Sequence, residues 1–317
     1  MPMKDRAVAF IFPGQGSQEV GMGKDFYESF PEAKTLWHEA NDALGFELSG
    51  VAFGGPPEAL QLTVNAQPAL LAASVAAARV LMAHGVMPIA AAGHSLGEYS
   101  ALVLAGALEF RHAVRLVRRR GELMQEAVPV GVGAMAALLG PDVAVVEALC
   151  DEASEDGAVA EVANVNAPEQ VVVAGHKEAV ERVVTLARAR GVKRAVMLAV
   201  SAPFHSRLMR PAAERLAGEL AGVPVAPPRF PVVRNVDAQP YAGPDEIRSG
   251  LEAQVASRVR WVECILALRR LGAETFVEAG PGRVLTGLLK RISEEAEGHA
   301  VGDLASLEKA LVALKAA

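Results

Sequence analysis

The segment Gly-His-Ser-Leu-Gly at residues 93–97 has the residue types and spacing for covalent chemistry. It matches the G-x-S-x-G pattern of a nucleophile elbow, between an expected strand over 86–92 and an expected helix over 98–104. The glycines permit a sharp turn that raises the serine hydroxyl above a sheet, and the free N–H groups opening the helix favour negative charge on a reacting oxygen. We therefore predict that Ser95 is a nucleophile; the alternative is an ordinary glycine-rich turn.

A serine hydroxyl needs a base, and His205 is the strongest candidate among the seven histidines. It follows the end of a predicted strand and opens a predicted helix, and strand ends are where sites assemble in α/β folds. His94 adjoins Ser95, but neighbouring side chains at a tight turn diverge, so we expect it to line the site. An imidazole with the usual pKa of about 6.5 can take the serine proton near neutral pH. For the third group that orients the base, Asp237, Glu278 and a backbone carbonyl all stay open.

A glycine-rich loop, Phe-Pro-Gly-Gln-Gly-Ser-Gln, occupies residues 12–18 after an apolar strand. A Walker A loop would need glycine where Gln18 stands, and a G-x-G-x-x-G pattern from Gly14 would need glycine where Glu19 stands. The loop therefore fits neither phosphate-binding pattern. Two interpretations are left: its N–H groups donate to an oxyanion beside Ser95, or it is a plain strand-to-helix turn.

The order of the predicted elements indicates an α/β protein with an inserted second domain. Residues 1–129 and 199–317 alternate strands, tight turns and helices, as in a main domain with a mostly parallel sheet. Residues 130–198 follow the order β-α-β-β-α-β of a ferredoxin-like unit, with a turn expected over 164–168. After residue 297 only a loose tail and one short helix are expected.

Composition limits the class of protein. The 317 residues are 51% hydrophobic and 21% charged, with a net charge of −6, which excludes disorder and disfavours nucleic acid as a partner. Cys150 and Cys264 form no CxxC pair, as expected for reduced thiols in a cytoplasmic protein. Residues 1–6 are charged and short, unlike a signal peptide. The apolar run 69–82 contains Arg79 and is shorter than the ~20 residues of a membrane span, so we predict that it is a buried helix. We expect a cytoplasmic monomer that does not cross a membrane.

Together the motifs resemble the malonyl-CoA:acyl-carrier-protein transacylases, an acyltransferase family of fatty-acid and polyketide synthesis. The resemblance covers residues from about 8 to 292 and keeps the family's motif order. It implies a hydrolase-like α/β main domain with a ferredoxin-like small domain. The matching segments are FPGQGSQ at 12–18, QPA at 67–69, GHSLGEYSA at 93–101, RLVRRRGELM at 115–124, GAM at 133–135, NVN at 164–166, SAPFH at 201–205, NVD at 235–237 and EAGPG at 278–282.

The resemblance also implies roles for individual residues. Ser95 matches the acylated serine and His205 its base. Gln15 and Leu96 match the residues whose backbone N–H groups form the oxyanion hole. Gln254 matches the position whose backbone carbonyl orients the histidine, which would explain the absence of a clear third carboxylate.

The resemblance assigns the choice of substrate to Arg120, because this residue matches the arginine that pairs with the malonyl carboxylate. A planar guanidinium can hold a carboxylate through two parallel hydrogen bonds, and an acetyl group would leave it unpaired. The alternative is that Arg118, Arg119 and Arg120 form one solvated face. Phe204 is expected to crowd an α-methyl group, which favours malonyl over methylmalonyl.

The implied reaction moves a malonyl group from malonyl-CoA to the phosphopantetheine thiol of an acyl carrier protein through a malonyl-serine. One thioester replaces another, so we expect neither a metal nor a redox cofactor. An acidic carrier would dock on a basic patch near the site. Three alternatives stay open: a serine hydrolase, an acyltransferase for another extender unit such as methylmalonyl, and a non-catalytic docking protein with a relic site.

Overall fold

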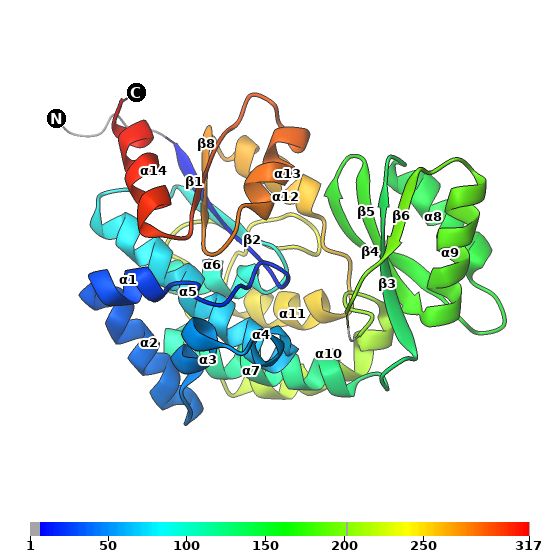
Figure 1. Cartoon of the computed structure of the whole chain (residues 1–317), viewed down its shortest axis with the longest axis horizontal. Helices are drawn as coiled ribbons and strands as arrows, with labels where there is room; N and C mark the ends of the chain where they lie inside the picture. The colour runs from blue at the N-terminus through cyan, green and yellow to red at the C-terminus, as the bar shows by residue number, and fades with distance from the viewer. Residues whose placement is uncertain (1–6, 201, 317) are drawn as a thin grey trace.

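A large α/β part and a smaller part with its own sheet lie side by side in the structure, a computed structural model (Figure 1). It describes residues 7–200 and 202–316. Residues 1–6, used above to judge a signal peptide, and Ser201 of the SAPFH segment lie outside the described residues. The predicted fold class is confirmed: a parallel sheet forms the large part and an antiparallel sheet the small one.

Five parallel strands form the central sheet, in the order β7-β2-β1-β8-β9. Their bounds are Val8–Phe12 (β1), Ala90–Gly93 (β2), Val232–Val233 (β7), Thr275–Ala279 (β8) and Glu297–Val301 (β9). β1 lies in the middle, and all five of its residues are buried, as expected of a parallel strand with helices on both faces. The nucleophile segment begins at the carboxyl end of β2, beside β1.

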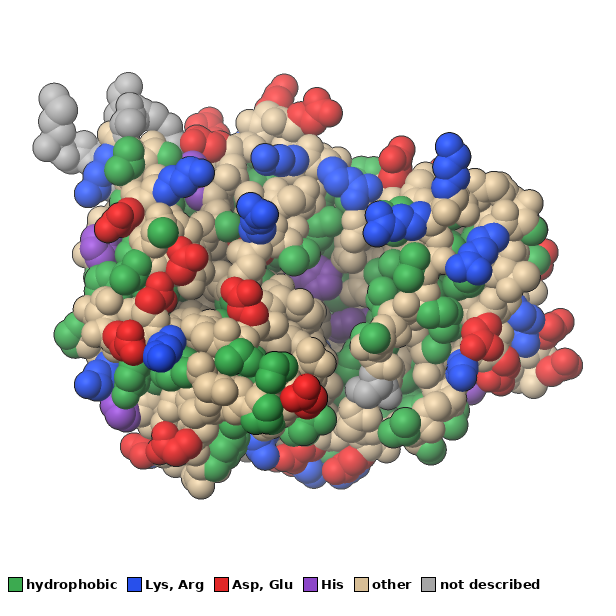
Figure 2. Space-filling model, viewed as in Figure 1, with side chains coloured by type: hydrophobic (Ala, Val, Ile, Leu, Met, Phe, Trp, Pro, Cys, Tyr) green, Lys and Arg blue, Asp and Glu red, His purple; other side chains and the backbone are tan. Residues whose placement is uncertain are grey.

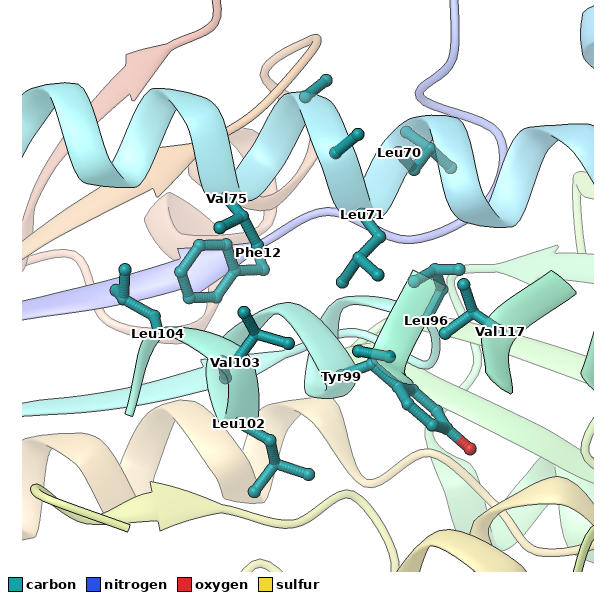
Figure 3. Packing of buried hydrophobic residues seen from close by; sticks show 14 of the residues in the cluster. Phe12, Leu70, Leu71, Val75, Leu96, Tyr99, Leu102, Val103, Leu104 and Val117 are labelled. Carbon is teal, nitrogen blue, oxygen red and sulfur yellow. The ribbon is translucent and has the colours of Figure 1, made fainter. Parts of the chain in front are cut away.

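Alternate residues of β1 pack into two hydrophobic cores. Phe10 and Phe12 join the larger core with helices α2 (Pro31–Leu44), α5 (Thr63–Ala83), α6 (Gly97–Leu104) and α7 (Phe110–Glu126). Ala9 and Ile11 face the other side, against α12 (Trp261–Arg270) and α13 (Val284–Ile292). Figure 3 shows Leu71 and Val75 pointing from α5 toward Phe12. The sheet end that carries the site is thus held from both faces.

The small part contains four antiparallel strands in the order β4-β5-β3-β6, the ferredoxin-like arrangement that the sequence predicted. Helices α8 and α9 share one hydrophobic core with this sheet. On the opposite face Met135, Ala163 and Val172 belong to the core of the large part, so the two parts are packed together. The bounds are Gly133–Leu139 (β3), Val143–Ala153 (α8), Ala160–Ala167 (β4), Gln170–His176 (β5), Lys177–Ala189 (α9) and Arg194–Met197 (β6).

Three local predictions were wrong. A turn was expected over 164–168, but most of this segment is the second half of β4, which pairs with β5 as far as Ala167. The pairing contains two register shifts, one between Val162 and Asn164 and one between Val165 and Ala167. The expected strand over 86–92 begins only at Ala90. The tail after residue 297 contains the edge strand β9, paired in parallel with β8.

Helix α5 is 21 residues long, and by length and composition it could cross a membrane, but 83% of its most apolar window is buried inside the structure. The prediction of a buried helix is therefore confirmed, although the helix begins at Thr63 rather than Ala69. The remaining helices are α1 (Lys24–Ser29), α3 (Leu48–Gly54), α4 (Pro57–Gln61), η1 (Arg207–Met209), α10 (Arg210–Ala221), α11 (Pro244–Val255) and α14 (Leu304–Ala316).

Candidate active site

Ser95 lies at a sharp corner between β2 and α6, with a left-handed backbone φ of 51°. A non-glycine residue adopts this conformation only where the surrounding structure imposes it, and such positions cluster at functional sites. The flanking glycines have no room for a side chain: a Cβ on Gly93 would lie 1.8 Å from the Gly97 carbonyl carbon, and one on Gly97 2.1 Å from the Phe12 oxygen. The geometry is that of a nucleophile elbow, as the pattern predicted.

His205 reaches the elbow from the segment that precedes η1, also with a left-handed φ, of 60°. Its Nε2 lies 2.7 Å from Ser95 Oγ. Its Nδ1 lies 2.9 Å from the backbone oxygen of Gln254 and 3.2 Å from that of Ser257. Carbonyl oxygens only accept hydrogen bonds, so Nδ1 carries the proton and Nε2 is free to accept the serine proton.

Two backbone carbonyls thus occupy the place of a triad carboxylate. Glu278 is buried elsewhere, where its oxygens accept from the backbone N–H groups of Leu285 and Thr286 at the start of α13. Asp237 pairs with Arg234 at 2.7 Å. Neither carboxylate orients His205. The carbonyl of Ser257 was missed from the sequence, because a backbone acceptor leaves no residue-type signal.

Burial, and to a smaller extent the positive charge of Arg120, lower the pKa of His205 to about 3. Only 4% of the residue is exposed. The expectation of an ordinary imidazole pKa is therefore wrong, because the sequence does not show how completely the ring is desolvated. The base is held neutral, which is the form that accepts a proton.

This depressed pKa predicts the pH profile of the first chemical step. A base with a lowered pKa stays neutral as the pH falls, so the second-order rate constant for acylation of Ser95 by a thioester should stay nearly constant from about pH 8 to about pH 5. A histidine with the ordinary pKa of about 6.5 would lose most of its rate over that interval. Quenched single-turnover reactions analysed by intact mass measure this constant, and a decline centred near pH 6.5 would contradict the assignment.

Arg120 lies beside the nucleophile at the buried face of α7, with 1% of its surface exposed. Its Nη1 donates to Gln67 Oε1 at 2.8 Å, and its Nη2 donates to Gln254 Oε1 at 2.9 Å and to Ser95 Oγ at 3.2 Å. Among the described residues its Nε has no hydrogen-bond partner and its guanidinium forms no direct ion pair. Burial lowers its pKa, and the charge of Glu98 opposes this effect only in part. A buried cation without a direct ion pair fits a site for an anionic ligand.

The neighbouring arginines differ from Arg120. The Arg119 side chain is 35% exposed and pairs with Glu122 and Glu219 on the surface. Arg118 is partly exposed and lies over the ring of Phe46. The alternative of one solvated arginine face is therefore wrong for Arg120.

The glycine loop after β1 packs directly against the elbow. The backbone N–H of His94 donates to the oxygen of Phe12 at 2.9 Å, and a Cβ on Gly14 would lie 2.5 Å from the His94 oxygen. Gln15 and Leu96 both line the cavity at Ser95, Leu96 as the N-cap of α6. In the described part of the chain neither backbone N–H has an acceptor. Both groups are thus available to an oxyanion, although the structure holds none.

A cavity of about 730 Å³ opens over Ser95 and is lined by residues of both parts. Figure 2 shows this hollow between the large and small parts, with histidine side chains inside it. His94 Nε2 lies 2.8 Å from Oδ1 of Asn166 on β4, which links the elbow to the small part, and burial lowers the pKa of His94. Phe204 lines the same cavity beside His205 and is 9% exposed. The volume lies in the range of small-molecule sites.

A serine paired with a neutral imidazole, two free N–H groups and a buried arginine define a serine acyl-transfer site on an α/β fold. A family model described as "Acyl transferase domain" matches residues 9–312. The chain belongs to this acyl transferase family, which confirms the resemblance noted from the motifs.

Individual relatives are similar to this chain along almost its whole length. The malonyl CoA-acyl carrier protein transacylase of Bacillus subtilis (strain 168) is 47% identical over 308 residues, 97% of each chain. The crystal structure of an acyl carrier protein S-malonyltransferase from Vibrio cholerae superimposes with a TM-score of 0.93 at 47% identity, covering 96% of this chain and 99% of that one. A malonyl-transacylase solved in complex with its type II PKS acyl-carrier protein gives a TM-score of 0.93 at 48% identity, covering 96% and 98%.

Proposed function

We propose that the protein is an [acyl-carrier-protein] S-malonyltransferase, which moves malonyl groups from malonyl-CoA to the phosphopantetheine thiol of acyl carrier protein for fatty acid biosynthesis. The observation that carries this proposal is the position of Arg120, whose buried guanidinium lies 3.2 Å from the Ser95 hydroxyl and forms no direct ion pair among the described residues. An acyl group bound to Ser95 would bring its own carboxylate to that cation. The names of the relatives, and the solved complex of one of them with a carrier protein, support the same substrates.

In the first half-reaction Ser95 Oγ attacks the thioester carbonyl of malonyl-CoA while its proton passes to His205 Nε2. The negative charge on the former carbonyl oxygen is stabilised by two backbone N–H groups, that of Gln15 in the glycine loop and that of Leu96 in the elbow. The carbon–sulfur bond then breaks, and His205 returns the proton to the departing CoA sulfur. A malonyl ester on Ser95 is left, and the base is neutral again.

In the second half-reaction the phosphopantetheine thiol of the carrier protein attacks the ester. His205 takes the thiol proton and gives it to Ser95 Oγ as the carbon–oxygen bond breaks. Free enzyme and malonyl carrier protein result. One thioester has replaced another, so we propose that no metal or redox cofactor takes part.

Arg120 would make the site selective for malonyl over acetyl, because an acetyl group leaves the buried guanidinium without a carboxylate partner. The malonyl carboxylate offers two oxygens to a planar fork of donors, whereas acetyl offers none. A buried charge left without its partner costs far more than a pair contributes, which makes the discrimination steep. His94 and Phe204 are proposed to shape the cavity around the acyl group. We further propose that the enzyme acts in the cytoplasm as a monomer.

The experiment that tests this function offers the acyl-enzyme a choice of acceptors. Purified protein is incubated with malonyl-CoA and phosphopantetheinylated acyl carrier protein, and malonyl carrier protein and free malonate are both quantified. We expect carrier product to exceed malonate strongly. Malonate as the main product would indicate a serine hydrolase, and no turnover of either kind would indicate a docking protein with a relic site.

Phe204 provides a prediction about the acyl group. Its side chain lines the cavity beside His205, and we expect the ring to crowd an α-methyl substituent. Phe204→Ser should raise kcat/KM for methylmalonyl-CoA relative to malonyl-CoA by about 10-fold, since relieving such a contact is worth roughly 1–3 kcal/mol. Competition between the two thioesters measures the ratio. An unchanged ratio would remove Phe204 from the selectivity of the site.

A further inference from the structure

Glu98, in the first turn of α6, is fully buried behind the nucleophile and has no role in the mechanism described so far. Three donors surround its carboxylate: the backbone N–H of Asn235 at 2.9 Å, the amide Nε2 of Gln254 at 2.8 Å, and the hydroxyl of Tyr241. Burial raises the pKa of Glu98 to about 7, and these three donors oppose that rise because they stabilise the ionised carboxylate, which only accepts hydrogen bonds. A buried acceptor with this many partners fixes the position of each of them.

The Gln254 side chain connects Glu98 to the arginine. Its Nε2 donates to Glu98 and, at 2.9 Å, to the backbone oxygen of Ser95, while its Oε1 accepts from Arg120 at 2.9 Å. If the amide were reversed, its NH₂ group would face the donors of Arg120 and its oxygen would face the carboxylate of Glu98, so both contacts would be lost. The hydrogen-bond network therefore specifies a single orientation of this amide.

That orientation matters because Arg120 has few acceptors. Within the described residues its guanidinium donates only to Gln67, Gln254 and the Ser95 hydroxyl, and it lies over the ring of Tyr99. Without the Gln254 oxygen, Nη2 would keep only the Ser95 hydroxyl, which is itself the reacting group. The fork would then be free to turn away from the place where an acyl carboxylate must lie.

Glu98 also braces the serine through Asn235. The Asn235 side chain accepts the N–H of Ser95 at 2.7 Å and donates to the oxygen of Gly93 at 2.8 Å. Its backbone N–H is the group bound by Glu98. Through Asn235 the carboxylate thus holds the backbone of the elbow at Gly93 and Ser95, and no hydrogen bond joins Asn235 to Arg120 in the described part of the chain.

We infer that Glu98 is a positioning residue for malonyl selectivity, which orients the Gln254 amide and thereby holds the Arg120 fork ready for the substrate carboxylate. The inference rests on the proposed function. Because Glu98 acts through Gln254, its loss should affect a substrate that needs Arg120 more than one that does not. Acylation by malonyl-CoA is therefore compared with acylation by the neutral acetyl-CoA.

Four variants separate this role from general damage. Glu98→Leu removes every acceptor at similar volume, and Glu98→Gln keeps an oxygen for Asn235 and Gln254 while its amide nitrogen meets the Tyr241 hydroxyl. Glu98→Asp, for the case that Glu98→Leu does not fold, keeps the charge but withdraws the carboxylate from Gln254. Glu278→Gln is the matched control, since it alters another buried carboxylate, which holds the start of α13 away from the site.

The readout is the single-turnover rate constant of Ser95 acylation, measured by intact mass with each thioester. We expect Glu98→Leu to lower the malonyl constant ~30-fold and the acetyl constant less than ~5-fold, as for loss of one charge-assisted hydrogen bond. Glu98→Asp should show the same preference more weakly, at about 5–10-fold for malonyl. Glu98→Gln should stay within ~3-fold with both, and Glu278→Gln should leave the ratio unchanged.

A second comparison tests whether Glu98 acts through Gln254. Gln254→Leu keeps the backbone carbonyl for His205 but removes the amide, and the double variant with Glu98→Leu should be no worse for malonyl than the poorer single variant. Equal losses with both thioesters, no loss with either, or additive losses in the double variant would each overturn the inference. Wild-type protein that malonyl-CoA does not acylate would instead overturn the proposed function.

Discussion

Ser95→Ala protein should form no covalent adduct with malonyl-CoA, and its transfer rate should fall by at least ~10⁴-fold. The hydroxyl oxygen forms the only covalent bond between protein and acyl group in the proposed mechanism, and among the described residues no other nucleophile reaches His205 Nε2 as Ser95 Oγ does at 2.7 Å. Cys150 and Cys264 are both buried, and burial raises the pKa of each thiol, so neither can substitute. Intact-mass spectra and carrier malonylation measure the two effects.

The fold should tolerate this substitution. The backbone N–H of Ser95 keeps its bond to Asn235, and only the hydroxyl contacts to His205 and Arg120 are lost. Thermal unfolding of the variant should therefore stay close to that of the wild type, which separates loss of chemistry from loss of structure. A Ser95→Ala protein that still transfers malonyl groups at the normal rate would refute the nucleophile assignment.

Arg120→Ala should produce the second largest effect, and it should depend on the substrate. We expect kcat/KM for malonyl-CoA to fall by about 10²–10³-fold, ~3–4 kcal/mol of transition-state stabilisation, because two charge-assisted hydrogen bonds to the carboxylate are lost. Acetyl-CoA never makes those bonds, so its kcat/KM should change far less or rise. Parallel measurements with the two thioesters give the ratio directly.

Two further variants serve as controls for this result. Arg120→Lys keeps a positive charge but not the planar fork, so it should recover only part of the loss. Arg119→Ala removes the adjacent, exposed arginine with its surface pairs to Glu122 and Glu219, and should leave both substrates nearly unchanged. Equal losses for malonyl and acetyl in Arg120→Ala would contradict the pairing of this residue with the carboxylate.

The sequence predicted the parts of the site that have local patterns. The corner at Ser95 needs two glycines between a strand and a helix. These glycines lie within five consecutive residues, so the sequence shows them directly. His205 could be ranked first because it stands at a strand end rather than within a helix. The β-α-β-β-α-β order likewise follows from the sequence of elements, and it gave the small sheet its correct arrangement.

The features that the sequence did not predict depend on contacts between segments that are distant in the chain. Glu98 is indistinguishable in sequence from an exposed residue near a helix start, and only packing against Tyr241 and Gln254 shows that it is buried. The depressed pKa of His205 arises from burial and from Arg120, which lies far away in the sequence on α7. The edge strand β9, Glu-Gly-His-Ala-Val, is short and has no regular apolar alternation, so its pairing with β8 left no signal.

The most direct test of the central claim is to isolate the covalent intermediate and follow where its acyl group goes. Wild-type protein is mixed with malonyl-CoA, freed of excess thioester, digested and mapped, and a parallel sample is chased with phosphopantetheinylated carrier protein. A single malonyl group on the peptide that contains Ser95, passed to the carrier thiol within one turnover, is the expected result. A modification on any other residue, or malonyl carrier protein formed without an acylated enzyme, would contradict the account.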